Sequence, residues 1–212
     1  MILIGQYDSP YVRRVAIALT LHGFAFEHRP WSVWADADKI AELNPMRRVP
    51  TLVLDGGEVL IESGAILDAL DEMAGPGRAM LPSSGAERRR ALKICALGSG
   101  LADKAVSLLY EGFLHDAPSQ VWIDRCRSQI ADVLSSLEID RAATEGLFWQ
   151  GETIGHADIM VACALNFVRE AHPDLFDAAR WPRLAGHGAL CEGLAPFQAI
   201  RQPLSVTMAD EG

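Results

Sequence analysis

The sequence predicts an α/β domain followed by an all-helical domain. Short apolar runs suited to strands alternate with helical patterns up to about residue 75, whereas nearly everything after about residue 84 has helical periodicity. A stretch rich in glycine, proline and serine, residues 75–83, separates the two patterns and suits a linker. We therefore expect a first domain over residues 1–76, a linker over 77–84 and a helical domain over 85–212.

The first domain should begin with a buried strand, because residues 1–5 form a short apolar run. Ser9 and Pro10 then begin a helix with an apolar face from Val12 to Leu19, and Gly23 ends it. Serine is a favoured N-cap and proline a favoured first helical residue. Ser9 is therefore the expected cap of this helix.

Val49-Pro50 stands directly before a second apolar run, residues 51–54. We expect this X-Pro bond to be cis, which turns the N–H and C=O of Val49 outward to pair with an extended ligand. Asp55-Gly56-Gly57 predicts a tight hairpin that joins strands over residues 51–54 and 58–61. Ser63 should then cap a helix whose free N–H groups suit a carboxylate.

Three long helices are expected in the second domain. Ser84 and Glu87 have the spacing of a capping box, which begins a helix extending to about residue 113. A second helix should run from about residue 121 towards residue 146. The third begins at Gly155 and is apolar on most sides, with Asp158 three residues on. Because a carboxylate near a helix start favours capping, we expect Asp158 to be structural.

Residues 43–67 resemble the glutathione-binding half-site of the cytosolic glutathione transferases. The matching residues are Asn44-Pro45, Arg48, Val49-Pro50 and Glu62-Ser63. The resemblance implies a thioredoxin-like α/β domain followed by an all-helical domain. It also implies that Val49 pairs with the cysteinyl backbone of glutathione, beside Pro50.

The same resemblance implies that Glu62 and Ser63 hold the γ-glutamyl end of glutathione and that Arg48 lies near its glycyl carboxylate. Arg47 departs from the family pattern, because the family usually has glycine before the basic residue. Which of the two arginines meets the carboxylate, or whether both do, is left open by the sequence.

In the resembling family the catalytic residue occupies the turn from the first strand to the first helix, and Ser9 looks like the serine version. A free thiol has a pKa of about 8.5, so only a small part is thiolate at neutral pH. A hydroxyl that donates to the sulfur and the positive end of a helix both stabilise the thiolate. Ser9 would act this way, without becoming covalent. Tyr7 is the second candidate, since other classes use a tyrosine here.

The first helix has two adjacent cations, Arg13 and Arg14, for which two interpretations stand side by side. They either form a solvated or salt-bridged helix face or lie near the sulfur. The second substrate should bind in a pocket between the two domains, lined by Tyr7, Tyr11, Ser107, Tyr110 and Phe113.

Composition excludes several classes of protein. The net charge is −9 over 212 residues and both halves are acidic, which argues against nucleic-acid binding. No apolar stretch reaches the length of a membrane span. The four cysteines form no CxxC motif and the histidines no ligand spacing, so we expect no metal. Reduced core cysteines and the lack of a leader predict a cytoplasmic protein.

The expected function is that of a glutathione transferase with glutathione as co-substrate, which conjugates the thiolate to a small electrophile in a detoxification reaction. Isomerase, dehalogenase and peroxidase activities remain alternatives, as does a non-catalytic ligand-binding or partner-binding protein of the same fold. A disulfide oxidoreductase would need a cysteine in place of Ser9. We also expect a twofold homodimer, formed through residues 66–73 and the helix after Ser84.

Overall fold

The computed structural model describes residues 1–205 and divides the chain into two compact units. Within the described residues, one unit comprises Met1–Met80 together with residues 195–205, and the other comprises Leu81–Leu194. The first contains a four-stranded sheet with helices, and the described elements of the second are helices. The fold class, a thioredoxin-like α/β domain followed by a helical one, is as predicted. The division into domains differs at residues 195–205, which were expected in the helical domain but pack with the α/β unit.

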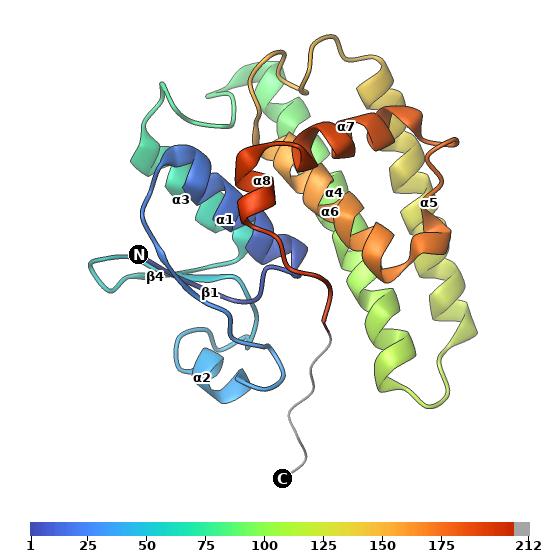
Figure 1. Cartoon of the computed structure of the whole chain (residues 1–212), viewed down its shortest axis with the longest axis horizontal. Coiled ribbons are helices and arrows are strands. Elements are labelled where there is room, and N and C mark those ends of the chain that lie inside the picture. The colour runs from blue at the N-terminus through green and yellow to red at the C-terminus, as the bar shows by residue number, and fades with distance from the viewer. Residues whose placement is uncertain (206–212) are drawn as a thin grey trace. The chain divides into compact units, whose positions relative to one another are not determined.

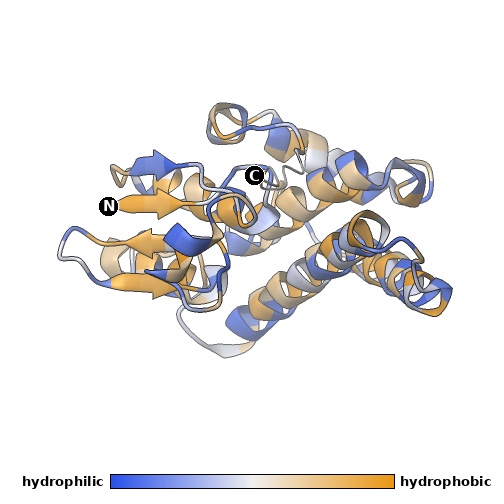
Figure 2. Ribbon diagram, turned by 90° about the horizontal axis from the view of Figure 1, so that it is seen from below, coloured by the Kyte–Doolittle hydropathy of each residue, from blue (hydrophilic) through white to orange (hydrophobic). Residues whose placement is uncertain are grey.

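The sheet has the strand order β2-β1-β3-β4, with β1 (Ile2–Ile4) parallel to β2 (Glu27–Arg29) and antiparallel to β3 (Thr51–Val53). β4 (Val59–Ile61) completes it, antiparallel to β3. Figure 2 shows β2 as a hydrophilic edge strand beside three hydrophobic ones. The polar sequence of β2 explains why apolar periodicity did not predict it.

Two helices, α1 (Pro10–His22) and α3 (Ser63–Ala74), pack against each other, and α2 (Ala37–Ala41) lies on the opposite side of the sheet (Figure 1). Ser9 caps α1 and Pro10 is its first residue, as predicted. Gly23 ends it with a left-handed φ of 71°. The core of this unit is apolar and fully buried, including Leu3, Val12, Leu19, Leu52, Ile66 and Leu70.

The predicted hairpin between β3 and β4 is confirmed. Gly57 takes the positive φ of 87° that the turn requires and donates its N–H to the carbonyl of Leu54 at 2.9 Å. The N–H of Leu54 donates to the carbonyl of Glu58 at 2.8 Å. Both strands are one residue shorter at the turn than predicted, since β3 ends at Val53 and β4 begins at Val59.

The helical unit contains α4 (Gly85–Leu114), α5 (Gln120–Ala142), α6 (His156–Ala171) and α7 (Pro182–Glu192), with a single 3-10 turn at Pro173–Leu175. α4 packs against α5 and α6, and α7 packs against the same two helices. α6 is buried along most of its length, as its apolar sequence predicted. Within the described residues, no helix combines the length and apolarity needed to cross a membrane. The four cysteines are free thiols, three buried and Cys95 half-buried.

The predicted capping box at Ser84 is wrong. The Ser84 side chain makes no capping hydrogen bond, although the helix begins at Gly85 as expected. Gly85 adopts a left-handed φ of 79°, and Ser84 itself is extended at φ −162°. This backbone path carries the serine hydroxyl away from the first turn, and Glu87 instead lines a cavity.

Asp158 is a structural residue, as predicted. Its fully buried carboxylate accepts the N–H of Gly155 and the N–H of Trp149, each at 2.9 Å, which ties the preceding loop to the start of α6. His187 on α7 lies against the same place, with its Nε2 3.9 Å from a carboxylate oxygen of Asp158 and 3.6 Å from the sulfur of Cys191. Burial raises the pKa of Asp158 to about 6 and lowers the pKa of His187 to about 4.

These two shifts act in opposite directions on acidification. The raised pKa of Asp158 means that the folded state gains stability as the pH falls below about 6. The lowered pKa of His187 means that the folded state loses stability between its unfolded value near 6.5 and about 4. Between these values the two contributions largely offset each other.

We predict that His187→Phe removes the loss of stability that the buried imidazole causes on acidification. Between pH 6.5 and 4.5 the free energy of unfolding of the native chain should fall by about 2 kcal/mol relative to that of the variant, because only the native chain must keep a buried imidazole neutral. Urea unfolding of both proteins at the two pH values measures this difference. Equal pH dependence in the two proteins would contradict it.

Candidate functional site

Ser9 lies at the turn between β1 and α1, half-buried and extended, with φ −67° and ψ 122°. Its Oγ accepts the N–H of Val12 at 3.4 Å, so the hydroxyl proton remains available to a ligand. The first turn of α1 contains no acidic residue. No carboxylate within the helix itself therefore neutralises the partial positive charge at its start.

Val49 supplies free backbone groups next to this turn. The Val49-Pro50 peptide bond is cis, as predicted. In the described part of the chain, neither the N–H nor the C=O of Val49 takes part in a hydrogen bond, although β3 begins only two residues later. A donor and an acceptor on one residue at a strand end can pair with an extended peptide backbone.

Gly5 brings Val49 and the first turn of α1 together. A Cβ placed on Gly5 would lie 2.5 Å from Cγ2 of Val12 and 2.7 Å from Cβ of Val49, and the residue has a φ of 124°. Both valines therefore lie against the bare backbone of Gly5. Since Val12 also donates to Ser9, the hydroxyl and the free backbone groups of Val49 belong to one packed cluster.

Glu62 and Ser63 begin α3, but their roles at the helix start differ from those predicted. Glu62 is the N-cap residue, with a left-handed φ of 65°, and Ser63 is the first helical residue. The Ser63 hydroxyl accepts a hydrogen bond from Nη2 of Arg14 at 2.6 Å. Non-glycine residues with positive φ cluster at ligand sites, where the surrounding structure holds them.

Arg48 and Arg47 point to different partners. Arg48 approaches Glu62, with its Nη1 3.4 Å from a carboxylate oxygen, and both side chains are more than half exposed. Arg47 has a left-handed φ of 52° and pairs with Asp38 at 2.8 Å. The left-handed backbone accounts for the glycine that resembling sequences have at this position.

Asn44 holds the loop that contains the two arginines and leads to Pro50. This buried amide donates to the carbonyl of Arg48 at 2.8 Å and to Oγ1 of Thr51 at 3.2 Å, and it accepts the N–H of Met46 at 3.1 Å. The sequence indicated Asn44 only as part of a motif. Its contacts make it the residue that holds Arg48 and Val49 in place.

Arg13 and Arg14 are both buried, so a solvated helix face, one part of the two interpretations left open by the sequence, is wrong. Arg13 donates from Nε to the carbonyl of Ile200 at 2.8 Å and from Nη2 to the carbonyl of Phe197 at 3.0 Å. Its guanidinium thus binds the C-terminal residues of the same unit. The interaction of Arg14 with Ser63 instead joins α1 to the start of α3.

Tyr7 stacks on His28, with ring centroids 3.8 Å apart and an interplanar angle of 4°. His28 in turn bonds through Nε2 to the carbonyl of Gly5 at 2.8 Å, an interaction that the sequence did not indicate. Burial raises the pKa of the Tyr7 phenol. A stacked ring of this kind suits a wall of the site better than the thiol-activating role considered for Tyr7.

The other predicted pocket residues lie on two helices. Tyr11 is half-buried on α1 in the α/β unit. Ser107, Tyr110 and Phe113 belong to α4 in the helical unit, where they are spaced three residues apart and Phe113 is 44% exposed. Three-residue spacing places them on one side of that helix.

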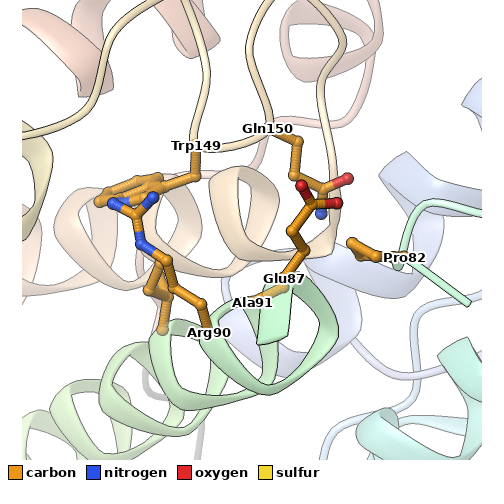
Figure 3. A pocket seen from close by; sticks show the side chains of 7 residues that line it. Pro82, Glu87, Arg90, Ala91, Trp149 and Gln150 are labelled. Carbon is orange, nitrogen blue, oxygen red and sulfur yellow. The ribbon is translucent and has the colours of Figure 1, made fainter. Parts of the chain in front are cut away.

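The helical unit has a cavity of about 410 Å³ of its own, which contains none of the predicted site residues. Figure 3 shows Glu87 and Gln150 pointing towards each other across it, with Arg90 beside the ring of Trp149. Arg90 is held by Asp140 at 2.7 Å and by Thr144 at 2.6 Å. These contacts join α4 to the end of α5.

Comparisons with known proteins agree with this geometry. Residues 3–78 match the family model for the glutathione S-transferase N-terminal domain, and residues 120–187 match that for the C-terminal domain. The uncharacterized GST-like protein YibF of Escherichia coli (strain K12) is 33% identical over 178 residues, which cover 81% of this chain and 85% of that protein.

Two solved structures are similar over nearly their whole length. A glutathione transferase family member from Pseudomonas fluorescens Pf-5, with bound glutathione, is 31% identical with a TM-score of 0.83 and covers 96% of this chain and 99% of its own. A glutathione S-transferase from Methylobacterium radiotolerans, in complex with glutathione sulfonate, is 27% identical with a TM-score of 0.90 and covers 100% and 98%.

The tight packing around Gly5 yields a prediction. Gly5→Ala should destabilise the protein by about 2–4 kcal/mol, because the new Cβ overlaps Val12 and Val49 and the backbone has a positive φ. Gly56→Ala is the matched control, since a Cβ on that residue would have no atom within 4 Å. Urea unfolding measures both, and equal stabilities of the two variants would contradict the assigned packing.

Proposed function

The chain belongs to the glutathione S-transferase family, and from that premise we propose that it conjugates the thiolate of glutathione to a small electrophile in a detoxification reaction. The free N–H and C=O of Val49 beside the Ser9 turn are the observation that carries this proposal. They match an extended peptide backbone, and the capped start of α1 lies next to them.

Glutathione has three groups to bind, and the α/β unit offers a partner for each. Its cysteinyl backbone pairs with Val49, which leaves the sulfur near Ser9. The γ-glutamyl carboxylate meets the N–H groups at the start of α3, where Ser63 and Glu62 lie. The glycyl carboxylate meets Arg48, which directly precedes Val49 and has a side chain that is more than half exposed.

Ser9 acts on the thiol as a hydrogen-bond donor. Its Oγ accepts the N–H of Val12 through a lone pair, so its proton is free to rotate towards a ligand. The donated bond and the positive helix end both favour the thiolate, which is the nucleophile. A bond then forms between the sulfur and a carbon of the electrophile as the leaving group departs, with Ser9 unchanged.

The assembly we propose is a twofold homodimer in the cytoplasm. The two predicted interface helices each present an exposed apolar residue, Met73 on α3 at 45% exposure and Leu92 on α4 at 43%. Exposed apolar side chains on such elements favour burial against a second copy. The free thiols of all four cysteines suit a reducing compartment.

Ser9→Ala tests the chemistry. The substitution should raise the pKa of the bound glutathione thiol by about one to two units and lower kcat/KM about tenfold at neutral pH. An ultraviolet titration of the bound thiolate and a pH profile of conjugation to chlorodinitrobenzene measure the two effects.

Ser119→Ala is the matched control for this variant. Ser119 caps α5 with the same geometry, its Oγ accepting the N–H of Trp122 at 3.4 Å. Both variants should lose about 1 kcal/mol of stability as helix caps, and only Ser9→Ala should change the thiol. Glutathione binding without turnover in the native chain would instead favour a non-catalytic ligand-binding protein.

The homodimer makes a separate prediction. Met73→Glu should shift sedimentation at micromolar concentration from dimer to monomer, because it places a charge in the proposed interface. Ile139→Glu, at a 72% exposed apolar position on α5, should leave the dimer intact. A native chain that sediments only as a monomer would refute the assembly.

A further inference from the structure

The C-terminal segment over residues 195–205, here named the C-terminal strap, belongs to the α/β unit and binds the turn that carries Ser9. It begins with α8 (Ala195–Ala199), which packs on α1. Hydrogen bonds then connect it to Tyr7, Asp8 and Arg13, two of which immediately precede Ser9 in the chain. The strap, although distant in sequence, therefore supplies hydrogen-bond partners to this turn.

Arg13 anchors the strap at its first half. The residue is 3% exposed, and its guanidinium donates to the carbonyls of Ile200 and Phe197 and lies 5.7 Å from the centre of the Phe197 ring. Hydrogen bonds from a charged donor are stronger than those between neutral groups. Phe197 is itself fully buried. This half of the strap is consequently fixed to the first turn of α1, where Arg13 lies.

Gln202 connects the second half of the strap to the turn itself. Its Oε1 accepts the backbone N–H of Tyr7 at 3.1 Å, and the N–H of Ser205 donates to Oδ2 of Asp8 at 3.1 Å. Tyr7 and Asp8 lie in the turn between β1 and α1, outside the sheet and helix ladders. The side-chain amide of Gln202 thus serves as the acceptor that a neighbouring strand or helix would otherwise supply.

We propose that Gln202 is a positioning residue for the thiolate-stabilising hydroxyl, and this inference rests on the proposed function. By holding the N–H of Tyr7, the strap sets the path of the two residues before Ser9 and hence the direction of its Oγ. A displacement of the order of 1 Å in a catalytic group can cost about a hundredfold in rate. Gln202 acts through the backbone, so its loss affects ionisation of the thiol more than binding of glutathione.

The test compares three variants of the full chain. Gln202→Ala removes the acceptor, Gln202→Glu keeps an oxygen in its place, and Gln198→Ala removes an exposed amide from the same segment. Hydrogen exchange of the Tyr7 amide, followed by NMR, reports whether the strap holds the turn. Ultraviolet titration of bound glutathione reports the thiol pKa, and conjugation to chlorodinitrobenzene separates kcat from KM.

We expect Gln202→Ala to speed exchange of the Tyr7 amide about tenfold and to raise the thiol pKa by about half a unit or more, with kcat reduced and KM nearly unchanged. Gln202→Glu should restore slow exchange, and Gln198→Ala should resemble the native chain. The inference would be overturned if the Tyr7 amide of Gln202→Ala exchanged as slowly as in the native chain. It would also be overturned if that amide exchanged faster while the pKa of the bound glutathione thiol stayed at its native value. A native chain that binds glutathione only as the thiol would overturn the proposed function as well.

Discussion

The close approach of Val12 and Val49 across Gly5 is the contact on which the site depends. Only a residue without a Cβ leaves room for it, since a Cβ there would lie 2.5 Å from Val12. Val12 donates its N–H to Ser9, and Val49 presents its own N–H and C=O beside the cis peptide bond. One packing constraint thus brings together a helix cap and a free backbone edge that are far apart in sequence.

Helix α1 extends this organisation through its two buried arginines. Arg14 donates to Ser63 at the start of α3, and Arg13 donates to the carbonyls of Phe197 and Ile200. A buried guanidinium is stable only when its donors are paired, so each arginine commits α1 to a distant segment. The two buried cations of α1 therefore hold distant segments of the α/β unit together. Arg48, which is more than half exposed, is the cation that we propose for the glycyl carboxylate.

Local patterns predicted much of this structure. Ser9-Pro10 and Gly23 marked both ends of α1, and Asp55-Gly56-Gly57 marked the hairpin, because caps and turns depend on residues close in sequence. Long-range partners escaped prediction. Nothing near Arg13 or Tyr7 indicates Ile200 or Gln202, and the polar sequence of β2 resembles a loop. Ser63 was predicted as the N-cap of α3, but the N-cap is Glu62. The left-handed φ of Glu62 depends on tertiary structure and could not be predicted from neighbouring residues.

The backbone of Val49 offers the most direct test of this account. Its N–H has no hydrogen-bond partner in the described chain, so its amide should exchange rapidly with solvent in the free protein. Saturation with glutathione should slow that exchange markedly, because the cysteinyl carbonyl accepts the bond. Exchange followed by NMR, with and without glutathione, measures this single amide. Glutathione binding confirmed by calorimetry with Val49 exchanging as fast as before would contradict the account.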